Sequence, residues 1–244
     1  MIDLHTHILH GIDDGAETLA ESLALARAAV ADGITTCAMT PHIHPGRYEN
    51  FKSSLEQHAE TFRTELARNN IPLNITLGAE VRLSIESLEQ ILSDEVPYLG
   101  HYGGKHIMLL ELPHQTIPVG SMQFVEKLLS LSIRPLIAHP ERNKAIMMDP
   151  TRVQPFLDVG CWLQVTAGSV VGDFGTTAQK VALRLLDDDD VYLVASDAHN
   201  LDARPPAMSK ARTALAKRYG ERAAQQLVTD RAANILGLPA EQRQ

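Results

Sequence analysis

The sequence predicts an α/β fold in which parallel strands form a closed or nearly closed barrel. Seven short apolar runs have the character of strands and are spread over the whole chain. Helical patterns lie between these runs, which implies parallel strand–helix–strand units. No composition break or low-complexity linker divides the 244 residues, so we expect one domain over residues 1–244. Seven such units favour a barrel over an open sheet.

The predicted strands are short and end beside polar residues. They cover residues 1–5, 34–39, 74–79, 107–112, 134–138, 161–165 and 191–196. The first helix is the clearest, because Thr18 can cap it, Glu21 completes a capping box and Gly33 ends it. Its apolar residues recur at helical spacing, at Leu19, Leu23, Ala26 and Val30. Further helices are predicted over 51–69, around 88–92 and 125–131, and over 207–219 and 221–236.

A run of four aspartates at 187–190 precedes the last predicted strand. A cation site is one interpretation of this run. Consecutive side chains cannot all face one ion, however, so we interpret it as a solvated loop.

Composition restricts the class of protein. The net charge of −8 and the pI of about 5.7 disfavour nucleic acid as a partner. The sequence shows no basic-then-apolar leader and no apolar run of the roughly 20 residues that a membrane span needs. Cys37 and Cys161 lie in apolar runs, as buried reduced thiols do. We therefore expect a cytoplasmic protein that does not insert into membranes.

Histidines and carboxylates follow the predicted strands at the ends where an α/β barrel places its chemistry. His5 and His7 flank Thr6, so a strand sends both imidazoles to the same face. The other candidates are Asp14, His42, Glu80, Glu111, His139, Asp197 and His199. Histidine and carboxylate are the ligands of Zn, Mn and Fe sites. The pattern predicts a polynuclear metal site.

Each candidate also has a structural interpretation. A single histidine after a strand is usually hydrogen-bonded and structural, and a single Glu there is usually solvated. Asp13 could take the role of Asp14, and His44 could reach the site or lie on its rim. The clustering of the candidates on one rim favours the metal site. We expect structural roles for the histidines that lack such placement, namely His10, His58, His101, His106 and His114.

Two arginines follow the last candidate ligands. Arg142 lies three residues after His139, and Arg204 lies in the loop after His199. A surface salt bridge is the usual role of an arginine. Beside a metal-lined rim, however, a guanidinium can bind phosphate oxygens in a bidentate way. Metals together with arginines indicate a phosphorylated substrate.

The combined motifs resemble the PHP (polymerase and histidinol phosphatase) superfamily. Within it, they are similar to the bacterial PHP-type protein-tyrosine phosphatases of capsule and exopolysaccharide loci. The motifs are DLHTH at 3–7, GIDDG at 11–15, TPH at 40–42, GAE at 78–80, IAHPER at 137–142, SDAHN at 196–200 and RPP at 204–206. The resemblance covers residues 1 to about 236 and implies a distorted (β/α)7 barrel with metals at the C-terminal strand ends.

The resemblance also implies a ligand set for three divalent ions, typically Mn, with Fe, Mg or Zn as alternatives. His5, His7, Glu80 and Asp197 would hold the first, Glu80, Glu111 and His139 the second, and Asp14, His42 and His199 the third. Family members often carry a second histidine directly after the position of His42. Here Ile43 intervenes, which leaves the role of His44 open.

The implied activity is hydrolysis of a phosphomonoester by a hydroxide held between metals, with Arg142, Arg204 and His42 as catalytic residues. The implied substrate is the phosphotyrosine tail of a bacterial autokinase that controls polysaccharide export, and oligomerisation stays open. A cysteine phosphatase loop is absent, because no arginine follows Cys37 or Cys161 at the required spacing.

Other functions remain as alternatives. Histidinol-phosphate phosphatase uses the same superfamily core on an alkyl phosphate. A PHP nuclease is disfavoured by the acidic composition. A non-catalytic kinase-binding module and a purely structural metal site are further possibilities, although structural sites are usually closed four-ligand cages.

Overall fold

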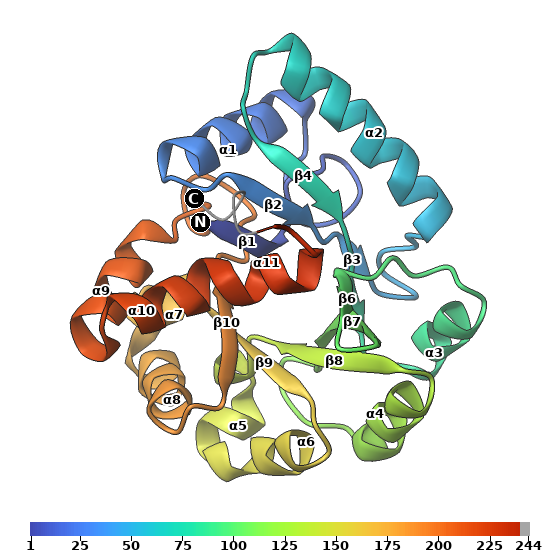
Figure 1. Ribbon diagram of the computed structural model, residues 1–244. Helices are drawn as coiled ribbons and strands as arrows, with labels where there is room; N and C mark the ends of the chain where they lie inside the picture. The colour runs from blue at the N-terminus through green and yellow to red at the C-terminus, as the bar shows by residue number, and fades with distance from the viewer. Residues whose placement is uncertain (240–244) are drawn as a thin grey trace.

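The computed structural model describes residues 1–239 and shows a mixed α/β fold with helices arranged around the strands (Figure 1). The strands are β1 (Ile2–Thr6), β2 (Thr36–Met39), β3 (His42–Ile43), β4 (Asn74–Leu77), β5 (Glu80–Arg82), β6 (Gly100–Tyr102), β7 (Lys105–Glu111), β8 (Ile133–Ala138), β9 (Trp162–Thr166) and β10 (Val191–Ala195). All seven predicted strands form within a few residues of their expected bounds. The short β3 and β5 were not predicted, nor was β6, which pairs antiparallel with β7.

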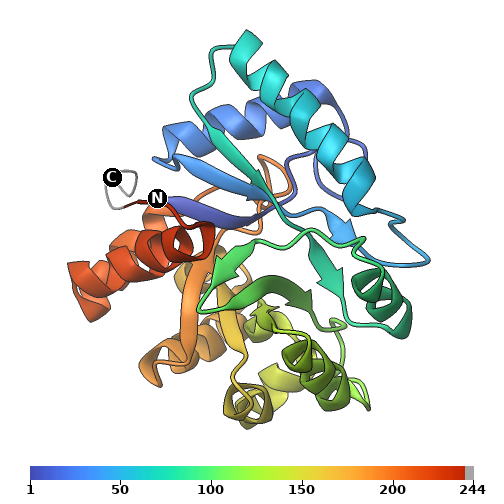
Figure 2. The same ribbon diagram turned by 45° about the vertical axis from the view of Figure 1, so that its right-hand side comes forward.

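The longer helices lie outside the strands. They are α1 (Leu19–Ala31), α2 (Lys52–Arg68), α3 (Ile85–Leu92), α4 (Ser121–Ser130), α8 (Gly175–Asp187) and α9 (Ser209–Tyr219). The shorter ones are η1 (Pro140–Arg142), α5 (Lys144–Met148), η2 (Pro150–Val153), α6 (Gln154–Asp158), α7 (Ala167–Val171), α10 (Glu221–Gln225), η3 (Gln226–Asp230) and α11 (Arg231–Leu236). Figure 2 shows α1 and α2 together on one side of β2 and β4.

The closed barrel expected from the sequence is not confirmed, because the strands form two sheets. One has the order β1-β2-β4, and the other has the order β10-β9-β8-β7-β5-β3. The strand predicted over 34–39 ends at Met39 as expected, and the one predicted over 74–79 ends two residues early, at Leu77. The segments that follow them, β3 and β5, pair with each other in the other sheet. Pro41 lies at the first break, and a proline cannot donate a ladder hydrogen bond.

The two sheets also meet between β1 and β10, again without a continuous ladder. Thr6 and Ala198 form an isolated parallel bridge. The backbone N–H of Asp197 donates to the carbonyl of His5 at 2.9 Å, and that of His7 donates to the carbonyl of Ala198 at 2.7 Å. These bonds hold the ends of β1 and β10 together where the candidate ligands lie.

Two apolar layers support this edge of the sheets. The smaller layer lies between the strands and contains Leu4, Leu109 and Leu136 together with Ile235 of α11. Figure 1 shows α11 in front of the strands at the centre of the molecule, on the face opposite the candidate site. The larger layer packs the outer strand faces against the helices. Because side chains alternate along a strand, Glu111 shares the inner face with Leu109, two residues earlier.

The predicted helices are confirmed, whereas α5, α6, α7 and the 13-residue α8 were not predicted. Thr18 caps α1 through the predicted capping box with Glu21. The missed helices α5, α6 and α7 have five residues each, which is too short to show a helical period. The aspartate run at 187–190 lies at the end of α8, as a solvated turn. Helix α8 ends at Asp187, and the next three aspartates are exposed or half-exposed. No helix within residues 1–239 is long and apolar enough to cross a membrane.

Candidate metal centre

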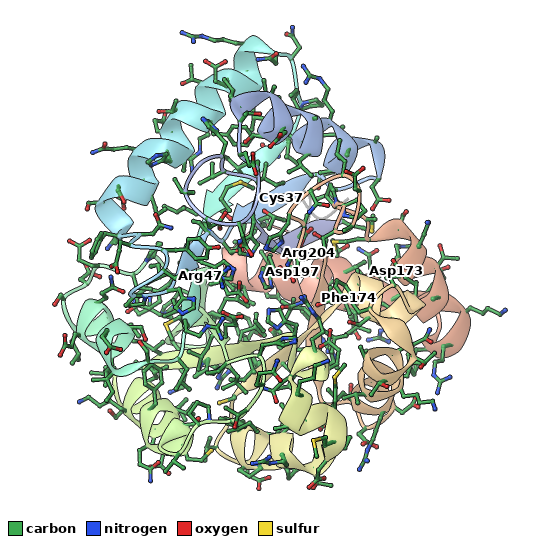
Figure 3. The ribbon with its side chains drawn as sticks, turned by 180° about the vertical axis from the view of Figure 1, so that it is seen from behind. Cys37, Arg47, Asp173, Phe174, Asp197 and Arg204 are labelled. Atoms are coloured by element: carbon green, nitrogen blue, oxygen red, sulfur yellow. The ribbon has the colours of Figure 1, made fainter. Side chains whose placement is uncertain are left out.

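The candidate metal centre lies where strands from both sheets end, on the face shown in Figure 3. The nine residues that the sequence predicts as ligands are His5, His7, Asp14, His42, Glu80, Glu111, His139, Asp197 and His199. Eight of them fall into three overlapping groups, and within each group the ligand atoms lie within 4.8 Å of one another. His139, the ninth, contacts a member of two groups.

The first group contains the two histidines of the first motif. Nε2 of His5 and Nε2 of His7 are 3.2 Å apart. Oε2 of Glu80 lies 3.3 Å from each of these nitrogens. Oδ1 of Asp197 lies 3.2 Å from Nε2 of His5. Both imidazoles therefore point to one place between two carboxylates, as the alternation along the strand predicted. These four side chains are nearly fully buried.

Hydrogen bonds on the far side of each imidazole fix its orientation. Oδ2 of Asp13 lies 2.7 Å from Nδ1 of His7, and Oε1 of Gln164 lies 2.9 Å from Nδ1 of His5. A carboxylate and an amide oxygen can only accept, so each Nδ1 carries the proton. Nε2 is then the nitrogen that faces the group and would bind a metal. Metal-binding histidines are typically held in this way.

The second group joins His42, Glu80 and Glu111. Nδ1 of His42 lies 3.0 Å from Oε2 of Glu80 and 3.9 Å from Oε2 of Glu111. His139 approaches Glu80 from its other oxygen, because Nε2 of His139 is 2.8 Å from Oε1. Glu80 thus belongs to both the first and the second group. The ligand set implied by the resemblance likewise assigns Glu80 to two ions.

The third group contains Asp14 and three histidines, one of which is His7 of the first group. Oδ1 of Asp14 lies 3.2 Å from Nε2 of His42 and 3.4 Å from Nε2 of His199. Nδ1 of His199 lies 2.9 Å from the backbone carbonyl of Asp197 and donates to it, so Nε2 again faces the group. Asp14, rather than Asp13, supplies the carboxylate here.

Several buried ligand atoms lack a hydrogen-bond partner among the described residues. They are Oε2 of Glu80, Oε2 of Glu111, Oδ1 of Asp197, Nδ1 of His42 and Nε2 of His199. Buried carboxylate oxygens and imidazole nitrogens without partners cost folding free energy. Coordination of divalent cations would satisfy all of them together. The donor set of oxygen and imidazole nitrogen atoms suits Mn, Fe and Zn.

The local charges shift the pKa values of the site residues strongly. Burial opposes protonation of His7, but the carboxylates of Asp13 and Glu80 outweigh it and hold its pKa well above the usual value. Burial likewise opposes ionisation of Glu80, but His5 and His42 outweigh it and hold the Glu80 pKa well below its usual value. Protons on the histidines therefore compensate the buried carboxylates, and bound cations would displace these protons.

Both predicted arginines reach the ligand carboxylates. Nη1 of Arg142 donates to Oδ2 of Asp197, and the Arg142 guanidinium lies 4.3 Å from the centre of the Phe174 ring. Arg204 lies 3.7 Å from Oδ2 of Asp14 and 3.8 Å from Oδ2 of Asp197. Figure 3 shows Asp197 and Arg204 together at the centre of this face. Two cations thus border the metal groups.

The backbone is strained at two of these positions. His139 has a φ of 35° and Asp197 a φ of 57°, both in the left-handed region that residues with a side chain rarely adopt. Such conformations cost about 1–3 kcal/mol each and are characteristic of functional sites. Here they turn the chain at the ends of β8 and β10, so that both side chains enter the site.

Several residues of the site were not predicted from the sequence. Asp13 was considered only as a substitute for Asp14, although it orients His7. Gln164 lies in a predicted strand. A polar residue between two apolar neighbours was the signal that could have identified it as part of the site. Nε of Arg82 lies 2.9 Å from Oε2 of Glu111, which adds a third guanidinium. Glu141 is fully buried beside Arg142.

The histidines assigned structural roles stay outside the three groups. His101 and His106, for example, face each other across the β6–β7 hairpin. His44 is also outside the groups and forms a bridge with Tyr48. Its role stays open.

Comparison with known proteins agrees with the fold and with a metal-dependent activity. The family model described as "Capsular polysaccharide synthesis, CpsB/CapC" matches residues 1–237. The tyrosine-protein phosphatase YwqE of Bacillus subtilis is 36% identical over 90% of this chain and 85% of the relative. The tyrosine-protein phosphatase CpsB of Streptococcus pneumoniae is 32% identical over 97% of this chain and 98% of the relative.

A solved structure gives the same result. It comes from work on YwqE from Bacillus subtilis and CpsB from Streptococcus pneumoniae, described as unique metal-dependent tyrosine phosphatases. It superposes with a TM-score of 0.86 at 33% identity and covers 93% of this chain and 91% of its own. The family match over nearly the whole chain and these relatives show that the chain belongs to the CpsB/CapC family of capsular polysaccharide synthesis.

Proposed function

We propose that this chain is a metal-dependent protein-tyrosine phosphatase that acts on a tyrosine autokinase in capsular or exopolysaccharide synthesis. The convergence of eight candidate ligands into three groups, with arginines at their edge, is the observation that carries the proposal. The named relatives are tyrosine-protein phosphatases. We further propose that residues 1–244 act as one domain, a distorted (β/α)7 barrel, and that the protein is cytoplasmic.

The proposed ligand set is that of three divalent ions, with Mn as the preferred metal. His5, His7, Glu80 and Asp197 would hold the first, Glu80, Glu111 and His139 the second, and Asp14, His42 and His199 the third. The position of His42 between Asp14 and Glu80 supports a shared role at the second and third ions. Bound divalent ions would supply an activated water at neutral pH and neutralise charge on the phosphoryl group.

The side chains of the chain itself would bind and orient the substrate. Arg142 and Arg204 are placed to donate to the equatorial oxygens of a phosphoryl group, where negative charge develops. Arg142 is fixed for this by Asp197 on one side and by the Phe174 ring on the other. The leaving phenolate has a pKa of about 10, so a strong general acid is less necessary than for an alkyl phosphate.

A cysteine-based reaction is disfavoured by the same structure. Cys37 and Cys161 are free and buried. Burial raises the pKa of the Cys161 thiol to about 12 and that of Cys37 well above its usual value. Neither thiol would ionise near neutral pH, and a thiolate is the nucleophilic form.

The test is steady-state phosphate release with added Mn, comparing a phosphotyrosine peptide with histidinol phosphate. We expect a much higher kcat/KM on the peptide. A preference for histidinol phosphate would replace the proposed activity by that of the alternative enzyme. Folded, metal-loaded His139→Ala with near-normal activity would contradict the role of the metal centre.

A further inference from the structure

Arg47 is an exposed cation held beside the candidate metal centre by aromatic stacking. Its guanidinium carbon lies 4.9 Å from the centre of the Tyr48 ring. The Tyr48 ring in turn lies 5.5 Å from the imidazole of His42, with an angle of 9° between the two planes. Tyr48 therefore contacts both Arg47 and the predicted ligand His42.

The backbone around Arg47 is fixed by a tight hairpin. The N–H of His44 donates to the carbonyl of Tyr48 at 3.1 Å, and the N–H of Tyr48 donates to the carbonyl of His44 at 2.8 Å. Gly46, with a φ of 82°, allows the turn between them. The position of Tyr48 against His42, and with it the position of Arg47, follows from this hairpin.

Arg47 has no ion-pair partner within residues 1–239, unlike the arginines closer to the centre. The nearest glutamate along the chain, Glu49, accepts a hydrogen bond from the backbone N–H of Gly46 at 2.6 Å instead. A guanidinium that is ordered by stacking loses less conformational entropy when it binds an anion. The typical exposed arginine lacks such a fixed position.

The surroundings of Arg47 restrict where an anion can bind. Next to the hairpin is a groove of about 620 Å³ whose lining includes Glu49, Glu86, Glu89 and Glu95. Beside Asp14 and His199 is a cavity of about 480 Å³ whose lining includes Glu17, Glu21 and Asp202. Both regions repel anions. In the view of Figure 3, Arg47 and Phe174 lie on opposite sides of Asp197.

We propose that Arg47, supported by Tyr48, is a specificity-determining residue that binds an anionic side chain one to three positions from the phosphotyrosine. This inference rests on the proposed function. Consecutive Cα atoms are about 3.8 Å apart, so such a side chain can extend from the central site past His42 to the guanidinium. The anion is a carboxylate or a second phosphotyrosine, because a guanidinium binds both in a bidentate way. Because the acidic cavities on either side disfavour anions, we expect the preference only at the peptide position whose side chain reaches Arg47.

The test uses phosphotyrosine peptides of one length with Glu, Ala, Lys or a second phosphotyrosine at each of the three positions on either side. Wild-type protein with Mn should show a kcat/KM about three- to fivefold higher for an acidic residue than for Ala at one position, as expected for an exposed ion pair. The difference should shrink in 1 M salt. A response to the second phosphotyrosine alone would identify phosphate as the anion, and a response to Glu would identify carboxylate.

Substitutions separate Arg47 from the overall charge of the protein. Arg47→Ala should abolish the preference and leave hydrolysis of para-nitrophenyl phosphate within about twofold, since that substrate has no neighbouring residue. Arg47→Lys should retain part of the preference for an acidic residue. Arg68→Ala removes the same charge from the exposed end of α2, where Arg68 pairs with Glu65, and should keep the full preference. A preference that survives in Arg47→Ala would overturn the proposal.

A second measurement keeps this test independent of catalysis. Affinities are measured by fluorescence anisotropy for the same peptides with a non-hydrolysable phosphonate in place of the phosphotyrosine phosphate. If wild-type protein hydrolyses none of the peptides but its affinity depends on Arg47 and the acidic residue, the proposed reaction fails and the Arg47 site stands. Equal affinities for acidic and alanine peptides would overturn the Arg47 site, whatever the turnover.

Discussion

Asp13 accepts a hydrogen bond from Nδ1 of His7 across 2.7 Å, and this contact determines which nitrogen of His7 faces the candidate metal centre. The same carboxylate also accepts the backbone N–H of His42 at 3.1 Å and that of Gly15 at 2.9 Å. One buried side chain thus ties the loop after β1 to the start of β3. It connects a residue of the first metal group with residues of the third.

We expect Asp13→Ala to lower the affinity for Mn by about 10- to 100-fold, as the loss of such an orienting partner typically does. Asp13→Asn should have a smaller effect, because its amide oxygen can still accept the His7 proton. The measurement is a calorimetric titration of metal-free protein with Mn. Glu17→Gln, which changes an exposed carboxylate of the same loop, is the matched control. Unchanged affinity in Asp13→Ala would contradict the orienting role.

Removal of metal should destabilise the fold. Without cations, the buried carboxylates Glu80, Glu111 and Asp197 each keep an oxygen that accepts no hydrogen bond from the described residues. A ligand that binds only the folded state stabilises it by about 2.7 kcal/mol at a concentration 100 times its Kd. We therefore expect the Tm to fall with a chelator and to rise steadily with added Mn. The Tm of His5→Ala should respond much less, and a wild-type Tm that is insensitive to Mn would argue against the site.

Under the proposed function, Arg142 should act mainly in the transition state, because it borders the candidate metal centre through Asp197 and would donate to the phosphoryl oxygens. Loss of one such donor typically costs 10²- to 10³-fold in kcat. We expect an effect of about this size for Arg142→Ala on a phosphotyrosine peptide, with partial activity in Arg142→Lys. Far-UV circular dichroism and Mn affinity serve as controls. A change confined to KM would assign Arg142 to substrate binding alone.

The sequence predicts where strands form along this chain better than it predicts how those strands pair into sheets. Apolar runs identify where strands form, since burial selects Val, Ile and Leu there. They do not show that the segments after β2 and β4 form separate strands, β3 and β5, in the second sheet. That division depends on which neighbour each backbone group bonds, which is a tertiary property.

The candidate ligands could be recognised in the sequence by residue type and position, whereas the residues that orient them could not. Histidine and carboxylate are common metal ligands, and the C-terminal strand ends of an α/β barrel are where its chemistry gathers, so these residues are candidates by type and position. Gln164 and Asp13 are recognised only once β9 and the loop after β1 are placed around His5 and His7. The antiparallel β6 was missed because its three residues carry no apolar alternation.

Asp3 should make stability depend on pH. It is fully buried, and burial is the main reason that its pKa rises from 3.8 to about 6. The folded state therefore keeps this proton up to about pH 6, whereas the unfolded state releases it near pH 4. Asp3 thus lowers the free energy of unfolding as pH rises from about 4 to about 6, by about 3 kcal/mol in total, and the loss persists at higher pH.

Asp3→Asn should remove this contribution, because an amide does not titrate. The fold should be kept, because the amide oxygen can still accept the backbone N–H of Ser196. We expect the difference in unfolding free energy between the variant and the wild type to move in favour of the variant from pH 4 to pH 6. Urea denaturation of metal-free protein at several pH values gives this difference, in which the other titrating groups cancel. A difference that does not change with pH would show that Asp3 has an ordinary pKa.

Glu141 should position Arg142 without touching substrate. Its Oε1 accepts the backbone N–H of Thr166 at 3.0 Å and the hydroxyl of Ser169 at 2.7 Å, which ties η1 to the end of β9 and the start of α7. Glu141→Ala would leave both donors unpaired in a buried place, at a cost of about 1–3 kcal/mol each. We expect it to lower both stability and kcat.

Glu141→Gln keeps an acceptor at Oε1 and separates the two effects. Because the tie to Thr166 and Ser169 is preserved, this variant should regain most of the kcat that Glu141→Ala loses, with KM near that of the wild type. Glu126→Ala, a substitution at an exposed glutamate of α4, controls for the loss of a carboxylate. If Glu141→Gln were as inactive as Glu141→Ala while folded and able to bind Mn, the negative charge beside Arg142 would be the essential feature, and the positioning role would be wrong.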